Sequence, residues 1–429
     1  MSKRAGRGMA RLEMPKMQKL AELDLPDLPM EDPAFSENPL PHFAAAREMH
    51  PWLATCAFGF VITQYDAMRD LLWLDHSMTT ANQGVVDIMN AEGTRWGRFQ
   101  KEMLGARQGE AHKRIRSVIA PAFTPQQANR HRSLMRKVIA DLLDEWAPKR
   151  AFDFEEFASH FPITVMCGLI GAPPEAVPRI RASLEAFGLS FSLDREHLPM
   201  LEDAMKLLDA FVQDLVAERR KNRRSDGERD LLEILIDTLE SGGLSERELY
   251  DLLIFALVAG YDTSKNALTL LMDAMIQRPD LYQRCADDFR FCQKVTEENF
   301  RYLTTSTIPR LTTKDLTYRD VIIPAGTMLF FPVSIAGRDK LAFEHADDFD
   351  PERPDLRKHL TFGMGVHICL GQFIARAQIQ EGLHQIAQRI RNPRRVGPSA
   401  WRPFYGVWGL RGLPIEFDPA PAQELATVE

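Results

Sequence analysis

The sequence predicts one mainly α-helical domain, of the α+β class, in which helices are accompanied by small β-sheets. Tracts with apolar residues at three- and four-residue steps dominate the 429 residues. Strand signals are short and few, and they do not alternate with the helices, so a parallel sheet of βαβ units is not indicated. No repeat, low-complexity linker or change of composition marks a second domain. We therefore assign residues 31–418 to one domain and expect flexible tails at residues 1–30 and 419–429.

Five helical tracts come before the middle of the chain or just after it. They cover residues 65–74, 128–146, 154–170, 201–220 and 231–239. Proline lacks a backbone N–H and collides with the preceding turn, so we expect Pro162 to mark a break or a first turn within the third tract.

A long helix follows, and its two ends are marked in the sequence. Ser245 and Glu248 form a capping box, in which each side chain pairs with the backbone N–H of the other residue. Apolar residues then continue at helical steps until Pro279 stops the pattern. A further helix is expected directly after Cys369. Strands are expected at residues 58–63, 321–323, 328–333 and 413–417.

Composition limits the classes of function. Hydrophobic residues make up 45% of the chain and charged residues 26%, which is typical of soluble globular proteins. The net charge of -7 gives no overall attraction to nucleic acid. No apolar run approaches the ~18 residues that a membrane helix needs. Residues 1–20 are basic and lack the apolar core of a secretory signal; a mitochondrial presequence is the alternative to the cytoplasmic location that we favour.

The five cysteines are odd in number and include no Cys-x-x-Cys pair, so neither a disulfide framework nor a structural zinc site is predicted. Four of them read as small buried apolar side chains: Cys56, Cys167, Cys285 and Cys292. Cys369 has a different setting.

Cys369 lies in a glycine-rich turn that runs from Phe362 to Gly371. Glycines permit positive φ angles and a close approach of backbone to a flat ligand. The start of a helix and its free N–H groups favour a thiolate. A shielded thiolate with N–H donors suits an axial ligand of haem iron. The alternatives are a buried cysteine in a tight turn, or a nucleophile with His367 as its base, although two-residue spacing in a turn does not form that pair.

Gly260, Asp262 and Thr263 lie close together in the long helix. A mid-helix glycine costs about 1 kcal/mol relative to alanine, and the two polar side chains compete for backbone hydrogen bonds. Such a cluster favours a local groove in which an alcohol holds oxygen and an acid relays protons. A simple kink or a close helix contact is the structural alternative.

The turn at Cys369 resembles the haem-binding signature of the cytochrome P450 family, Phe-x-x-Gly-x-His-x-Cys-x-Gly, at every fixed position. The segment from Ala259 to Thr263 resembles the family's Ala/Gly-Gly-x-Asp/Glu-Thr motif. This resemblance implies a single triangular helical domain, with haem b between the long central helix and the helix after Cys369. It also implies that Asp262 and Thr263 form the proton relay.

The same resemblance assigns supporting roles to other residues. Glu298 and Arg301 match the family's Glu-x-x-Arg pair, with Arg353 as the arginine that completes the network. Haem propionates need arginine and histidine partners, and Ile308 replaces one polar partner that the family often has. The cofactor-binding residues implied in this way are His112, Arg116, Ala259, Gly260, Arg310, Phe362, Gly363, His367 and Gly371.

The implied activity is a monooxygenase that hydroxylates an apolar small molecule, such as a terpenoid, an aromatic compound, a fatty acid or a steroid. Electrons are expected from NAD(P)H through a ferredoxin and its reductase, which would dock on a basic set of Lys113, Arg114, Arg116 and Arg376. Two alternatives remain: a peroxide-driven peroxygenase, and a haem-thiolate sensor or carrier without turnover. The expected substrate contacts are Phe255, Val258, Ser306, Val407 and Trp408.

Overall fold

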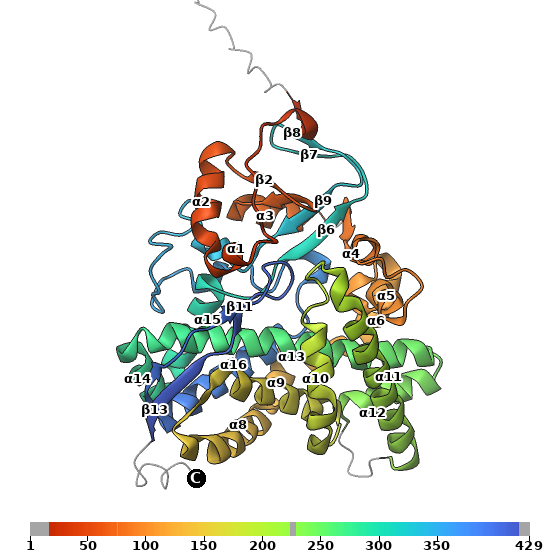
Figure 1. Ribbon diagram of the computed structural model, residues 1–429. Helices are drawn as coiled ribbons and strands as arrows, with labels where there is room; N and C mark the ends of the chain where they lie inside the picture. The colour runs from red at the N-terminus through yellow and green to blue at the C-terminus, as the bar shows by residue number, and fades with distance from the viewer. Residues whose placement is uncertain (1–16, 75, 224–228, 420–429) are drawn as a thin grey trace, which may run out of the picture.

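The structure is a computed structural model that describes residues 17–419 except residue 75 and residues 224–228. Helices form the broad part of a triangular outline, and the largest sheet lies toward the opposite end (Figure 1). The predicted mainly helical fold with small sheets is therefore confirmed.

The helices agree with most of the predicted tracts, with shifts of a few residues at their ends. They are α1 (Pro33–Glu37), α2 (Pro39–Met49), α3 (Tyr65–Leu72), α4 (Asn82–Ile88), α5 (Arg95–Glu102), α6 (Gly109–Ile119), α7 (Pro125–Arg130), α8 (Arg132–Trp146), α9 (Phe154–Ile170), α10 (Val177–Phe187), α11 (Leu198–Lys221), α12 (Leu231–Glu240), α13 (Glu246–Ile276), α14 (Pro279–Asp287), α15 (Phe289–Tyr302) and α16 (Gln372–Arg389).

The strands form four small sheets. The largest has the order β2-β3-β9-β6-β4, and the others are β1-β8-β7, β10-β13-β5 and β11-β12. Their bounds are β1 (Gln18–Lys19), β2 (Leu53–Cys56), β3 (Gly59–Ile62), β4 (Met78–Thr80), β5 (Ala151–Asp153), β6 (Ile308–Thr312), β7 (Leu316–Tyr318), β8 (Val321–Ile323), β9 (Met328–Phe331), β10 (Ile390–Arg395), β11 (Ala400–Trp401), β12 (Leu410–Arg411) and β13 (Pro414–Pro419). In β6, Arg310 pairs with Leu329 of β9 on one side and with Thr80 of β4 on the other.

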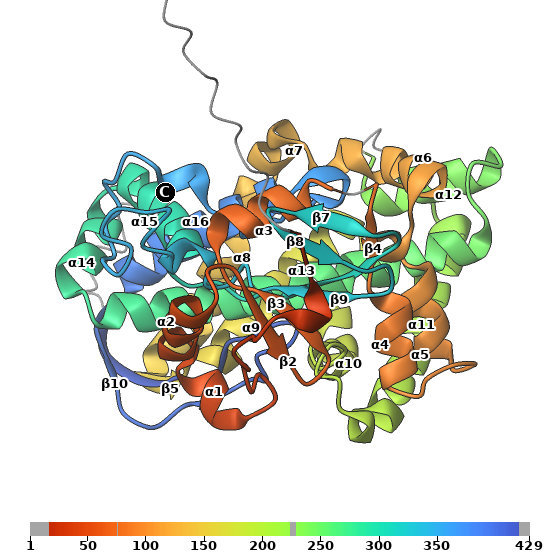
Figure 2. The ribbon, with the colours of Figure 1, turned by 90° about the horizontal axis from the view of Figure 1, so that it is seen from above.

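The long helix α13 organises the core. Both predicted hydrogen bonds of the capping box between Ser245 and Glu248 are present at its start. Figures 1 and 2 show α13 crossing the width of the molecule beneath the five-stranded sheet. Its apolar residues belong to one large cluster that also includes α9 and α16.

The glycine in α13 serves close packing. A Cβ atom at Gly260 would come within 2.7 Å of the sulfur of Met166 on α9. The segment is α-helical throughout, and the close helix contact that was the structural alternative is present.

Two expectations need correction. Pro162 lies inside α9, which continues from Phe154 to Ile170 without a break. The ring is buried against the core, and this packing outweighs the lost backbone hydrogen bond. Residues 17–30 pack on the domain instead of forming a tail, because β1 pairs with β8 and the side chains of Leu20, Leu28 and Met30 are buried. The remainder of the expected tail, residues 1–16, lies outside the described residues, as do residues 420–429.

None of the helices in the described part of the chain combines the length and the apolar character that crossing a bilayer requires.

Candidate active site

The loop that carries Cys369 turns sharply before α16. Gly363 and Gly365 have φ angles of 68° and 72°, which only glycine adopts without strain. The N–H of Cys369 donates to the carbonyl of Phe362 over 2.8 Å, which closes the loop. The position of Cys369 just before the helix therefore follows from local sequence, as predicted.

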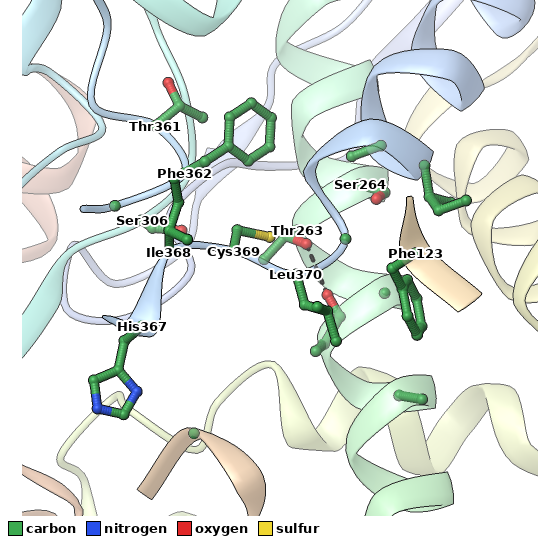
Figure 3. A pocket seen from close by; sticks show the side chains of 18 of the residues that line it. Phe123, Thr263, Ser264, Ser306, Thr361, Phe362, His367, Ile368, Cys369 and Leu370 are labelled. Carbon is green, nitrogen blue, oxygen red and sulfur yellow. Dashed lines mark hydrogen bonds between the residues drawn. The ribbon is translucent and has the colours of Figure 1, made fainter. Parts of the chain in front are cut away.

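A cavity of about 400 Å³ separates this loop from α13. Figure 3 shows Cys369 and Thr263 on opposite elements that line it. Eleven further predicted site residues line the same cavity: His112, Arg116, Phe255, Ala259, Gly260, Ser306, Arg310, Phe362, Gly363, His367 and Gly371. The cavity brings together residues that lie more than 250 positions apart in the sequence.

The lining fits a flat macrocycle with acidic groups at one edge. A Cβ atom at Gly371 would meet nothing within 4 Å, so the space beside Cys369 is open. At the edge, the rings of His112 and His367 lie 4.5 Å apart between centroids, and Arg116 and Arg310 line the same cavity. The Nε2 atom of His367 is buried and has no hydrogen-bond partner among the described residues. These positive and donor groups are suited to propionates.

Cys369 has exposed surface and lines the cavity, yet protein surrounds its sulfur closely enough to affect its ionisation. Burial raises the pKa of the Cys369 thiol, while the N–H of Gly371 and the charges of Arg116 and Arg376 act in the opposite direction. The expected N–H donor is therefore present, but in the chain alone burial has the larger effect. A bound metal cation would supply the missing stabilisation of the thiolate.

Comparisons with known proteins agree with this geometry. The family description "Cytochrome P450" matches residues 179–392. Luteothin monooxygenase from Streptomyces thioluteus is 31% identical over 403 residues, which are 92% of this chain and 97% of that protein. This chain belongs to the cytochrome P450 family.

A further relative and a solved structure bear on the activity and the fold of this P450. Mycinamicin IV hydroxylase/epoxidase from Micromonospora griseorubida is 31% identical over 311 residues, which are 71% of this chain and 76% of that protein. The crystal structure of epothilone D-bound cytochrome P450epoK is 21% identical, covers 92% of this chain and 100% of that one, and superposes with a TM-score of 0.83, which shows the fold. The chain is thus a P450 monooxygenase that binds haem b, and Cys369 is the residue that would hold its iron.

The network predicted around Arg301 of this P450 is fully buried. Arg301 forms two hydrogen bonds with Glu298, at 2.8 and 2.7 Å, and Arg353 pairs with the same carboxylate at 3.2 Å. The remaining N–H groups of Arg301 donate to the carbonyls of Gly337, Ala346 and Asp348. Arg301 thereby joins α15 to the segment that leads into the Cys369 loop.

Thr263 and Asp262 point in different directions. The hydroxyl of Thr263 lines the main cavity and donates to the carbonyl of Ala259 over 2.9 Å, which leaves its oxygen lone pairs available. Asp262 does not line this cavity and is 3% exposed. Its carboxylate pairs with Arg402 at 3.1 Å and with Lys265 at 3.3 Å.

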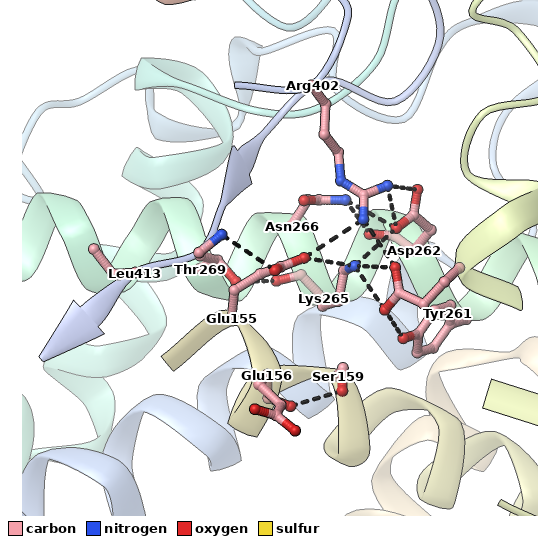
Figure 4. Close-up of polar contacts among 12 residues, drawn as sticks. Glu155, Glu156, Ser159, Tyr261, Asp262, Lys265, Asn266, Thr269, Arg402 and Leu413 are labelled. Atoms are coloured by element: carbon pink, nitrogen blue, oxygen red, sulfur yellow. Dashed lines mark hydrogen bonds and ion pairs between the residues drawn. The ribbon is translucent and has the colours of Figure 1, made fainter. Parts of the chain in front are cut away.

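Asp262 belongs to a buried charge network that sequence reasoning missed. Lys265, with no exposed surface, also pairs with Glu155 and Glu185, each at 2.8 Å, and Arg402 pairs with Glu185 at 2.9 Å. Figure 4 shows both cations directed at the carboxylates. Two cations therefore face three carboxylates. A lysine three residues after Asp262 in an otherwise apolar helix was the only local signal for this network.

Two of the carboxylates that pair with Lys265, those of Asp262 and Glu185, differ in how readily they take up a proton. Burial raises the pKa of Asp262, although Arg402 and Lys265 oppose this effect. Burial also acts to raise the pKa of Glu185, but Lys265, Tyr261 and Arg402 together lower it to about 2. Asp262 is thus the carboxylate of this pair that takes up a proton more readily.

The predicted substrate contacts divide into four groups. Ser306 lines the main cavity, and Val258 and Val407 line a smaller side cavity of about 160 Å³; Phe255 lines both. Trp408 lines neither. Its indole stacks on Trp401 with 4.8 Å between ring centroids and donates to the carbonyl of Ser36 over 2.9 Å. The structure therefore gives Trp408 a packing role in place of the predicted contact.

The predicted basic set beside the Cys369 loop is partly neutralised. Arg114 pairs with Glu248, and Arg376 pairs with Glu297 at 2.6 Å. Arg116 donates to the carbonyl of Ile368 over 2.7 Å. Lys113 is the most exposed of the four, with 71% of its side chain accessible.

Proposed function

We propose that this P450 hydroxylates an apolar small molecule with O2 and two electrons from NAD(P)H, delivered by a ferredoxin and its reductase. One observation carries the proposal: Cys369 and Thr263 line one largely apolar cavity from opposite elements. The haem supplies oxygen activation, which a thiolate ligand favours. The chain positions the substrate, limits water and handles protons.

Thr263 is the proposed oxygen-holding alcohol. Its hydroxyl is anchored to Ala259, so its oxygen faces the cavity in a fixed position. Asp262 is adjacent in sequence and is the carboxylate that accepts a proton more readily. We infer that protons reach Thr263 from Asp262, whose link to the surface runs through Lys265 and the half-buried Glu185.

Thr263→Ala should uncouple the reaction. We expect consumption of NAD(P)H to continue while hydroxylated product per NAD(P)H falls severalfold and peroxide release rises, because protons are no longer delivered productively. Product, peroxide and NAD(P)H are measured together in the reconstituted system. Thr269→Ala is the matched control, because Thr269 makes the same hydrogen bond to the residue four positions earlier but lines neither cavity. If Thr263→Ala forms as much product per NAD(P)H as the unchanged protein, the proposed role of Thr263 in proton delivery is wrong.

The same experiment separates the alternatives. A peroxygenase would give product with peroxide alone and would not depend on Thr263. A sensor or carrier would bind haem through Cys369 and give no product either with NAD(P)H and ferredoxin or with peroxide. The placement of Thr263 in the cavity favours the monooxygenase.

The ferredoxin is proposed to dock beside the Cys369 loop, where α6 contacts Ile368 through Arg116. Lys113 lies on the exposed side of α6. Lys113→Glu should slow reduction by ferredoxin about tenfold at low salt, with less effect at high salt and little change in substrate affinity. Stopped-flow reduction across salt concentrations measures this, with Lys206→Glu on α11 as an equally exposed control. A reduction rate that does not respond at any salt concentration would exclude this docking site.

A further inference from the structure

A smaller side cavity lies next to the main cavity and is lined partly by other residues. It shares Phe255, Ala259 and Thr263 with the main cavity, so the two adjoin each other beside α13. Its volume of about 160 Å³ matches that of cavities that accept one benzene ring. Its walls include four phenylalanines: Phe99, Phe187, Phe191 and Phe255.

Four side chains in this wall are polar, those of Gln100, Ser190, Asp262 and Thr263. Gln100 of α5 is 2% exposed, and Ser190, in the connection between α10 and α11, is 4% exposed. Both line the side cavity. The amide oxygen of Gln100 accepts a hydrogen bond from Asn82 over 3.2 Å, but its amide N–H groups have no acceptor among the described residues. The oxygen of Ser190 accepts from Trp96 over 3.3 Å, and its O–H likewise has no acceptor in the described chain.

Gln100 and Ser190 are held close together. Trp96 and Gln100 are four residues apart, so they lie on the same face of α5, and Trp96 contacts Ser190 directly. The edge-to-face contact between Phe99 and Phe187, 5.8 Å between centroids, fixes the same two segments. Both carboxylate oxygens of Asp262 are bound by Arg402, Lys265 or Asn266. Thr263 donates its own hydroxyl to Ala259, and within the described chain no hydrogen bond joins it to Gln100 or Ser190.

We propose that the side cavity binds a ring-sized apolar end of the substrate, and that Gln100, assisted by Ser190, donates a hydrogen bond to an acceptor oxygen on that end. A buried donor without an acceptor costs about 1–3 kcal/mol, so a ligand oxygen that accepts the bond is selected over a plain hydrocarbon. This inference rests on the proposed function. It narrows the substrate class to compact ring compounds that carry a carbonyl or ether oxygen remote from the oxidised carbon.

The test uses the haem-loaded protein and two matched probes, 4-phenylcyclohexanone and phenylcyclohexane. Calorimetry and the shift of the haem absorption band give both dissociation constants. In Gln100→Leu, we expect the constant for the ketone to rise about tenfold, while that for the hydrocarbon changes less than about twofold. Ser190→Ala should give a smaller shift of the same kind. Gln283→Leu on α14, which lines neither cavity, should change neither constant.

Gln100→Leu also removes the acceptor of the buried Asn82 amide. If that variant does not fold, the pair Asn82→Leu with Gln100→Leu replaces both partners by apolar groups, which is close to neutral for stability. Equal shifts for both probes, no shift for either, or no binding of the ketone to the unchanged protein would overturn the inference. Each sample is also checked for the reduced, CO-bound spectrum and for turnover. If these are normal, only the inference fails; if they are lost in the unchanged protein, the proposed function fails.

Discussion

Replacing Cys369 by serine should abolish the thiolate-type absorption of the reduced, CO-bound protein and lower substrate hydroxylation to background. Cys369 is the only cysteine that lines the cavity within the described residues. A serine hydroxyl ionises far less readily than a thiol and is a poor ligand for this iron. The spectrum and the product yield are measured after haem supplementation, so that simple loss of cofactor during purification is not counted as an effect of the ligand.

Cys56→Ser is the matched control for this prediction. Cys56 is a buried cysteine at the end of β2 and lines neither cavity. Its replacement should leave the spectrum and the activity in place. A thiolate-type spectrum that survives in Cys369→Ser would show that another residue binds the iron, and the assignment of the active site would then be wrong.

Lys265→Met should lower the free energy of unfolding by about 3–5 kcal/mol, the usual cost of removing one partner from a buried ion pair. Lys265 has no exposed surface and pairs with Glu155, Glu185 and Asp262. Methionine preserves most of the side-chain length, so the loss comes from carboxylates left buried beside a single cation, Arg402. Denaturant unfolding of the haem-loaded protein, followed by far-UV circular dichroism, measures the change.

Two further variants make this prediction specific. Lys137→Met removes an ion pair with Asp141 in which both side chains are exposed, and it should cost at most about 1 kcal/mol. Adding Glu185→Gln to Lys265→Met should recover part of the loss, because it removes one of the uncompensated carboxylates. Equal losses of unfolding free energy in Lys265→Met and Lys137→Met would show that burial does not make the Lys265 ion pairs more important for stability.

Local sequence determined much of the fold and the reactive centre. The capping box at Ser245 starts α13 as expected, and the Cys369 loop carries its own glycines, closing hydrogen bond and following helix. Glu298 and Arg301 are three residues apart on one helix, so their pairing was also predictable. These features depend on residues close together in the chain, and their geometry follows from backbone rules.

Features that depend on distant partners were decided by the tertiary structure. Arg402 reaches Asp262 across 140 positions of sequence, and no local pattern marks that contact. Trp408 was expected to contact the substrate but packs on Trp401. The sequence gives no sign that Asn82 binds the amide oxygen of Gln100 and leaves the amide N–H groups of Gln100 available to other partners. Burial and pairing are properties of the packed chain. The sequence therefore determined which side chains could bind iron, donate protons or form ion pairs. Packing decided which of them line the cavity and which pair with one another.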